Sequence, residues 1–185
     1  FNFDCIVINN VQGAFAATSH LIRQGHSRIG YLKSNLTINN FLERFEGFRK
    51  ALANYEIQFE PASLVTLGSS IESSYRAMNA YLAGKPDLPT AYFAENDQLA
   101  LGAIKAIKES GIRVPEDVSV VGFDNLALAD VFEPALTTVN VPKEQLGLLA
   151  VERLVAKIRE NRDEFVKIEI GTTIVERASV SKLRK

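Results

Sequence analysis

Short apolar runs rich in β-branched residues alternate along the chain with longer amphipathic stretches. The apolar runs predict strands at 5–8, 28–32, 63–67, 91–94, 118–123, 136–141, 165–170 and 172–178. Helical spacing of apolar positions predicts helices at 12–24, 41–54, 71–83, 97–110 and 143–161. Several strand runs are almost continuously apolar and are followed by a helix, as a parallel sheet covered on both faces requires. The pattern therefore predicts an α/β fold with an open, mostly parallel sheet and helices on both faces.

The ends of the predicted helices carry ordinary capping signals. Ser69 and Glu72 have the spacing of a capping box ahead of the helix 71–83. Gly25, Gly84 and Gly111 are expected to end three of the helices. These signals fix where the helices stop, and so where the polar loops begin.

Polar residues follow the carboxyl ends of four predicted strands, at 34–40, 68–70, 95–97 and 124–125. In open α/β sheets, ligands bind at this edge. Amides, hydroxyls, a few carboxylates and one nearby guanidinium suit a small polar molecule with many hydroxyls. For any single one of these residues, the alternative that it is merely a solvated loop residue stays equally open.

Composition narrows the class of protein. Hydrophobic residues make up 46% and charged residues 23% of the 185-residue chain, which is typical of a globular domain. The net charge is -1 without a basic stripe, so these residues are not expected to bind nucleic acid. No apolar run reaches the length of a membrane span and no export signal opens the sequence, so we expect a cytoplasmic protein without membrane contact.

Catalytic and cofactor motifs are weak or missing. The sequence lacks the phosphate-binding loop, the dinucleotide-binding glycine motif, the nucleophile elbow and the zinc-protease helix motif. His20 and His26 sit near the end of a predicted helix, where a structural role is favoured over catalysis. We therefore expect no metal, no cofactor and no enzyme activity. An α/β enzyme would have to rely on carboxylates alone.

Five segments together resemble one family. They are "LIRQGHSRIGYL", "ERFEGFRKAL", "PTAYFAENDQLALGAIKAIKESGIRVPEDVSVVGFDN", "PALTTVNVPKEQLG" and "TTIVERAS". In order and spacing they resemble the effector-binding core of the LacI/GalR family of bacterial transcription regulators, over residues 4 to 181. The resemblance implies a periplasmic-binding-protein-like fold, in which two Rossmann-like subdomains close around an effector.

The resemblance also implies an assignment of segments and partners. Residues 1–138 and 163–181 would form the C-terminal subdomain, and 139–162 would belong to the other subdomain. The family implies a homodimer, a small effector that is a sugar or sugar derivative, and operator DNA bound only through a helix-turn-helix headpiece absent from these residues. With one cleft wall missing, effector binding by these residues alone is expected to be weak.

The resemblance assigns four ligand-binding residues. Asp124 would accept effector hydroxyls or donor nitrogens, Arg44 and Asn96 would supply donors, and Phe93 would form a stacking wall. Two features depart from the family pattern. Glu95 stands where many members have a small residue, and "VINN" (7–10) has asparagines where an aspartate is common.

Two helices are expected to lie at interfaces. The helix 143–161 has a wide apolar surface that needs a second chain, a swap or a displaced position if its own subdomain does not cover it. The helix 97–110 is apolar on nearly all sides and by resemblance lies near the dimer contact with Leu128 and Phe132; the alternative is a helix enclosed in the core. A periplasmic or lipid-anchored sugar-binding protein of the same fold stays open as an alternative function.

Overall fold

The computed structural model describes residues 3–160 and 164–183. The strands are β1 (Cys5–Ile8), β2 (Ile29–Ser34), β3 (Leu64–Leu67), β4 (Ala91–Ala94), β5 (Ser119–Asp124), β6 (Thr137–Asn140), β7 (Lys167–Ile170) and β8 (Thr173–Val175). The helices are α1 (Asn10–Arg23), α2 (Asn39–Asn54), α3 (Ile71–Ala83), α4 (Asp97–Glu109), α5 (Leu128–Val131) and α6 (Lys143–Glu160), with a 3-10 turn η1 at Pro61–Ser63. The strands and long helices expected from the sequence are all found, with ends shifted by a few residues.

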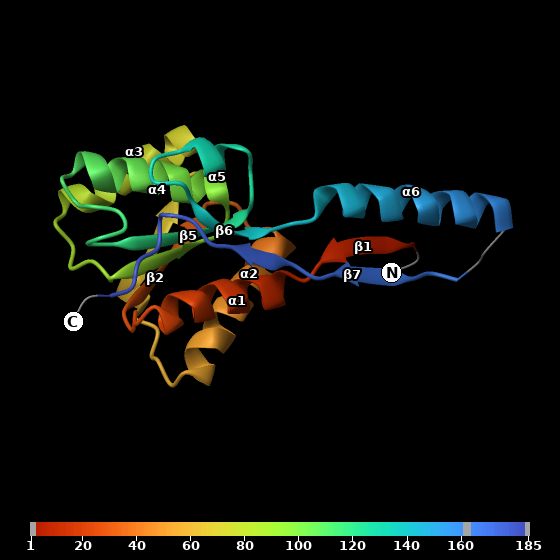
Figure 1. Ribbon diagram of the computed structural model, residues 1–185, viewed down its shortest axis with the longest axis horizontal. Coiled ribbons are helices and arrows are strands. Elements are labelled where there is room, and N and C mark those ends of the chain that lie inside the picture. The colour runs from red at the N-terminus through yellow and green to blue at the C-terminus, as the bar shows by residue number, and fades with distance from the viewer. Residues whose placement is uncertain (1–2, 161–163, 184–185) are drawn as a thin grey trace.

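The main sheet has six strands in the order β3-β2-β4-β5-β6-β8. Its pairings are parallel except for β8, which runs antiparallel to β6. Helices α3 and α4 cover one face, and α1 and α2 cover the other (Figure 1). The expected fold class is confirmed.

Each face of the main sheet has its own hydrophobic core, because successive side chains of a strand point to opposite faces. Along β2, Leu32 packs with α3 and α4, while Tyr31 packs with α1 and α2. The Tyr31 ring lies 5.5 Å from the Phe93 ring and 5.0 Å from the Phe48 ring, centroid to centroid. Burial on both faces explains why the strand runs are apolar without alternation.

Strands β1 and β7 form a separate two-stranded parallel sheet that lies with α6 beside the main body (Figure 1). Their register pairs Cys5 with Lys167 and Ile8 with Ile170. The expected segment boundaries placed both strands with the C-terminal subdomain, whereas the pairing puts them with α6. An apolar run predicts a strand without specifying its neighbour, so the sequence pattern could not separate the two sheets.

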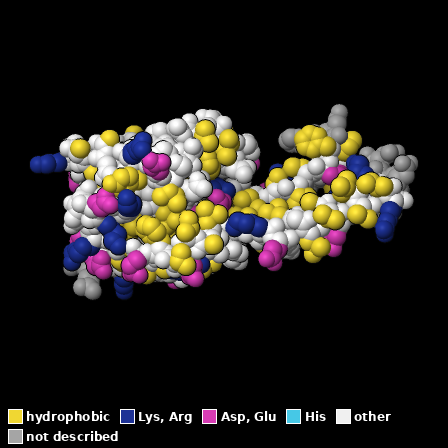
Figure 2. Space-filling model, turned by 90° about the horizontal axis from the view of Figure 1, so that it is seen from above, with side chains coloured by type: hydrophobic (Ala, Val, Ile, Leu, Met, Phe, Trp, Pro, Cys, Tyr) yellow, Lys and Arg dark blue, Asp and Glu magenta, His cyan; other side chains and the backbone are white. Residues whose placement is uncertain are grey.

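Helix α6 is covered on one side only. Arg153 on this helix pairs with Asp4, with Nε 2.8 Å from Oδ2, and so fixes the helix beside β1. Its exposed apolar side chains are Leu148, Val151, Leu154, Val155 and Ile158. Hydrophobic side chains gather on this extension in Figure 2. The helix thus lies displaced from the main body with an open apolar face, one of the arrangements expected from its sequence.

Three local features differ from the sequence-based expectations. The capping box of α3 joins Ser70 to Ser73 instead of Ser69 to Glu72. The short helix α5 falls in a stretch where no helix was expected. Helix α4 is enclosed within the chain, with Leu101 and Ile104 fully buried, so its apolar sides are explained by the core.

Within residues 3–160 and 164–183, no helix is long and apolar enough to cross a membrane.

Candidate functional site

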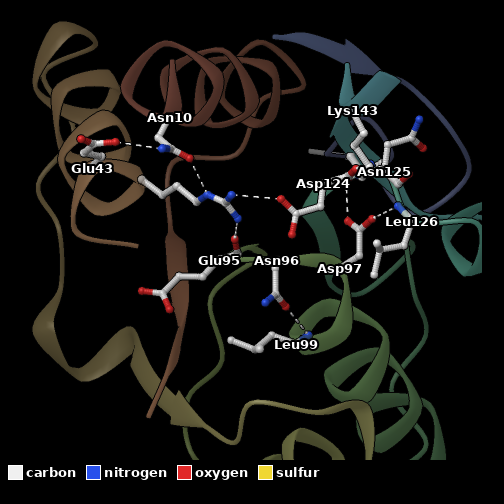
Figure 3. A network of polar contacts seen from close by, with 12 residues as sticks. Asn10, Glu43, Glu95, Asn96, Asp97, Leu99, Asp124, Asn125, Leu126 and Lys143 are labelled. Carbon is white, nitrogen blue, oxygen red and sulfur yellow. Dashed lines mark hydrogen bonds and ion pairs between the residues drawn. The ribbon is translucent and has the colours of Figure 1, made fainter. Parts of the chain in front are cut away.

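The candidate site is built around Arg44, near the carboxyl ends of β4 and β5. The Arg44 side chain is only 4% exposed. Nε donates to Asn10 Oδ1 at 3.0 Å, Nη1 to the Glu95 carbonyl at 2.5 Å, and Nη2 to Asp124 Oδ1 at 3.0 Å (Figure 3). Arg44 therefore joins α1, the β4–α4 turn and the end of β5.

An aromatic ring fixes the plane of this guanidinium. Arg44 Cζ lies 3.8 Å from the centroid of the Phe123 ring, a cation-π contact from the residue before Asp124. With three bonded nitrogens and one face covered, Arg44 orients Asp124 in this structure. That Arg44 also donates to an effector stays a prediction.

Asp124 and Asn125 form a sharp corner with unusual backbone angles. Their φ values are +103° and +49°, both in the region that non-glycine residues avoid. Lys143 of α6 donates to both backbone carbonyls of the corner. The Asn125 amide donates to Asn140 Oδ1 at 2.9 Å and accepts from Arg177 at 2.9 Å. Such strain persists only where surrounding contacts enforce it, and it is typical of functional positions.

Asp124 presents a carboxylate to the edge of the sheet. Its side chain is 28% exposed, and Oδ1 carries the bond to Arg44. Burial raises the pKa of Asp124, while the charge and hydrogen bond of Arg44 oppose that shift. Within the described residues, Oδ2 has no hydrogen-bonding partner. This oxygen can accept a hydroxyl or N–H donor from a ligand.

Asp97 holds the loop that follows the corner at Asp124 and Asn125. It is fully buried at the start of α4 and accepts hydrogen bonds from the Leu126 amide at 2.7 Å and from Thr138 Oγ1 at 2.5 Å. Burial raises the pKa of Asp97 to about 6, and these two hydrogen bonds counter the shift. Because both of its oxygens are bonded within the chain, Asp97 positions the loop after Asp124.

The other two expected ligand-binding residues, Asn96 and Phe93, lie in different surroundings from each other. Asn96 caps α4, since its Oδ1 accepts from the Leu99 amide at 3.0 Å, while its side-chain NH₂ group stays available as a donor. Phe93 has an exposed fraction of 0% and lies in the aromatic core with Tyr31. The alternation along β4 turns Phe93 under the sheet, so this structure does not present it as a stacking wall.

Sequence reasoning missed the part played by α1 and by α6. Asn10 is buried, and besides accepting from Arg44 it donates to Glu43 Oε2 at 2.8 Å. The asparagine pair in "VINN" was noted only as a departure from the family pattern. Lys143, which holds the corner, lies eighteen or more residues from it, and no local pattern indicated this contact.

The histidines have structural surroundings. The ring of His26 lies between Thr90 Oγ1 at 3.0 Å and the Ser181 carbonyl at 3.1 Å, and so joins the end of α1 to the C-terminal segment. His20 lies 3.5 Å from Glu176. In the described segments, neither histidine bonds a serine side chain, and no cluster of three or more acidic, histidine or cysteine residues could hold a metal ion.

A family model and curated relatives match nearly the whole chain. The model of the periplasmic binding protein-like domain matches residues 18–180. The HTH-type transcriptional repressor PurR of Photobacterium profundum is 38% identical over 180 residues, covering 97% of this chain and 54% of the relative. The protein of the same name from Erwinia tasmaniensis is 42% identical over 178 residues, covering 96% and 52%. The chain thus spans about half the length of the curated relatives it matches.

Solved structures of transcription regulators also superpose on nearly the whole chain. A transcriptional regulator CelR–cellobiose complex superposes with a TM-score of 0.88 at 32% identity, covering 96% of this chain and 54% of that one. A LacI family regulator from Enterococcus faecium with bound ribose gives 0.89 at 29% identity, covering 98% and 67%. An Escherichia coli sugar-binding regulator of the LacI family, complexed with phosphate, gives 0.84 at 28% identity, covering 95% and 62%.

The chain belongs to the periplasmic binding protein-like domain family. Within it, the relatives and structural neighbours are regulators of the LacI group, which confirms the family expected from the sequence motifs.

Proposed function

We propose that this chain is the effector-sensing part of a LacI-family transcription regulator and that its effector is a sugar or a similar polyhydroxy molecule. The observation that carries the proposal is the Asp124 carboxylate, oriented by Arg44 with one oxygen free at the carboxyl edge of the sheet. A carboxylate in this position accepts hydroxyl donors, and the NH₂ group of Asn96, in the turn after β4, is a second candidate contact as a donor. The neighbours with cellobiose and ribose support the choice of sugar.

The proposed mechanism is a shift between two arrangements of the main sheet relative to the β1–β7–α6 extension. The main sheet and the β1–β7–α6 extension are joined by the segments around Asn9, Val141 and Gly171. Lys143, on the first turn of α6, bonds the carbonyls of Asp124 and Asn125. An effector bound at Asp124 therefore acts where the two parts meet. It changes their arrangement only to the extent that it binds one arrangement more tightly than the other.

The proposed partners follow from this role. A homodimer would use the surface of α5, where Leu128 and Val131 are exposed and Phe132 is half-buried. Operator DNA would be bound by a headpiece outside residues 1–185. The relatives' name, which includes "HTH-type", supports that view.

Two alternatives are less well supported. A periplasmic or lipid-anchored sugar-binding protein would share the fold, but the relatives are repressors over almost all of this chain. An α/β enzyme needs an activated nucleophile or an acid and base pair. The carboxylates of Asp97 and Asp124 are held by Thr138, Leu126 and Arg44 in positions that suit loop anchoring and ligand contact.

The test is a thermal-shift screen of the protein at the full length of its gene against sugars, sugar phosphates and purines. A ligand that binds the folded state raises the melting temperature in a concentration-dependent way. We expect a sugar to do so, and Asp124→Ala to abolish the shift. The matched control is Asp87→Ala, at an exposed ion pair with Arg28 away from this network. A shift that survives Asp124→Ala would overturn the site assignment.

A further inference from the structure

A small pocket lies directly beside the candidate site and has a different chemical character. It has a volume of about 60 Å³ and is lined by Leu36, Ile38, Phe41, Leu42, Phe45 and Glu95, with Lys33 and two other residues completing the wall. The Glu95 backbone carbonyl accepts from Arg44, so the pocket and the Asp124 carboxylate lie on either side of one network. That volume is enough for several waters or for one small chemical group.

The Glu95 carboxylate provides the polar group of this pocket. Its exposed fraction is 1%, and Oε2 accepts from the Ser34 amide at 2.6 Å. Across the described parts of the chain, Oε1 has no hydrogen-bonding partner. Figure 3 shows the carboxylate pointing away from Asp124. A donor from a ligand or from water that bonds this oxygen would stabilise the carboxylate.

A second buried polar group faces this carboxylate. The Tyr31 hydroxyl is fully buried and has no hydrogen-bonding partner among the residues that the structure describes. It lies near enough to Glu95 to lower the pKa of that carboxyl, although its geometry falls short of a hydrogen bond. The pocket is therefore lined by one carboxylate among apolar side chains, with a buried hydroxyl behind that carboxylate.

The rim of the pocket is apolar and open to solvent. Leu36 is 48% exposed, Ile38 is 45% exposed and Leu42 is 54% exposed. These side chains come from the loop after β2 and the first turn of α2, at the edge of the sheet where the ligand is expected. Large apolar side chains grouped at the mouth of a pocket are typical of binding sites.

We propose that this pocket is a subsite of the effector site that takes an uncharged apolar group carrying an O–H or N–H donor, and that it rejects anionic groups. The inference rests on the proposed function and specifies the effector further: a sugar with an aryl or alkyl substituent fits better than a plain sugar or a sugar phosphate. The donor bonds Glu95, and the apolar body covers Leu36, Ile38 and Leu42.

The charges around the pocket support this selectivity. Lys33 is the cation on its wall and partly offsets Glu95, whereas the Arg44 guanidinium is bonded to Asn10, Asp124 and a backbone carbonyl. A phosphate in this pocket would face the Glu95 carboxylate, and like charges repel. Burial raises the pKa of Glu95 to about 7, so donor binding strengthens as the pH rises through that value.

The test uses three small probes and amide chemical shifts of the 185-residue chain. Benzyl alcohol has the apolar ring and the donor, benzoate has the same ring with an anion, and glycerol has donors without a ring. We expect benzyl alcohol to move the amide resonances of Ser34 and Leu36 in a saturable way, and benzoate to bind at least about tenfold more weakly. Glycerol should leave both resonances in place.

Two variants make the result specific. Glu95→Gln keeps an acceptor for the Ser34 amide and removes the charge, so it should bring benzoate to within about threefold of benzyl alcohol. Ile38→Ser alters an exposed rim residue without disturbing the core, and should weaken benzyl alcohol several-fold. Equal binding of benzyl alcohol and benzoate to the unaltered chain, or no shift at Ser34, would overturn the subsite.

The two proposals can fail separately. A sugar that raises the melting temperature through Asp124, together with no benzyl alcohol binding, would overturn the subsite alone. Benzyl alcohol binding that depends on Glu95, together with no sugar response, would leave the pocket and overturn the sugar effector.

Discussion

Arg44 Nη2 lies 3.0 Å from Asp124 Oδ1, although eighty residues separate the two in sequence. The pair joins the second helix to the end of the fifth strand, and Asn10 and the Glu95 carbonyl complete the coordination of the guanidinium. The same contact both stabilises the fold and orients the carboxylate that we assign to the effector. Substitution of Arg44 should therefore affect the free energy of unfolding more strongly, and substitution of Asp124 should affect ligand binding more strongly.

Arg44→Ala should lower the free energy of unfolding by about 3 kcal/mol, because it removes a buried charge and takes the donor away from Asp124 Oδ1 and from Asn10 Oδ1. Asp124→Asn should cost less, about 1 kcal/mol, since this side chain is partly exposed and an asparagine still accepts from Arg44. Urea denaturation measures both. As a control, Arg76→Ala breaks an exposed pair with Glu72 and should change stability by less than about 0.5 kcal/mol. Equal effects of Arg44→Ala and the control would contradict the network.

The contribution of Glu95 to the stability of the chain should fall as the pH rises from about 4.5 to 7. Burial raises the pKa of Glu95 from 4.5 to about 7, so between these values the folded state binds more protons than the unfolded state. The stabilisation is complete below the unfolded pKa and is lost as the pH passes the folded one. Asp97, with its pKa raised to about 6, acts in the same direction from about pH 4 upward.

The matched variant for this prediction is Glu95→Gln, which does not titrate. Relative to the unaltered chain, it should gain up to about 3 kcal/mol between pH 4.5 and pH 7.5, mostly above pH 5. Denaturation curves at a series of pH values measure the difference. Parallel curves for the two chains over this range would show that Glu95 titrates normally.

Gly122→Ala should destabilise the chain by about 2 kcal/mol through overpacking. A Cβ at this position would clash with Asp97 Oδ1 and lie 2.9 Å from Leu136 Cδ2. Asp97 cannot withdraw without losing its bonds to Leu126 and Thr138. Gly147→Ala is the control, because a Cβ there meets nothing within 4 Å. Thermal unfolding of the two variants compares them, and a stable Gly122→Ala chain would show that Asp97 is free to move.

The 185-residue chain should self-associate through the open face of α6. Leu154 and Ile158 are exposed on that face, and their contact with a second copy would remove apolar area from water. Sedimentation velocity at rising concentration should show dimers or larger species, and Leu154→Lys with Ile158→Lys should return the chain to monomer. Val131→Lys on α5 is the control for the proposed dimer contact, because it leaves the face of α6 unaltered. A chain that stays monomeric at millimolar concentration would contradict the prediction.

The sequence determined the elements, the fold class and the family. Apolar runs and helical stripes are local patterns, and burial of both sheet faces makes the runs of the strands almost continuously apolar and so easy to recognise. The place of Asp124 at the carboxyl edge of the sheet was also predictable, because it follows a buried strand and such strand ends meet at one edge. The spacing of its motifs was enough to indicate the LacI group, which the comparisons confirm.

Only the tertiary structure decided how the site is assembled. Phe93 and Glu95 are two residues apart near the end of one strand, yet Phe93 is enclosed in an aromatic core and Glu95 lines a pocket. The pairing of β1 with β7, the Lys143 contact to the Asp124 corner and the use of Asn10 by Arg44 join residues far apart in the chain. Such contacts depend on how whole elements pack, and a local pattern carries no information about which distant element a side chain will meet.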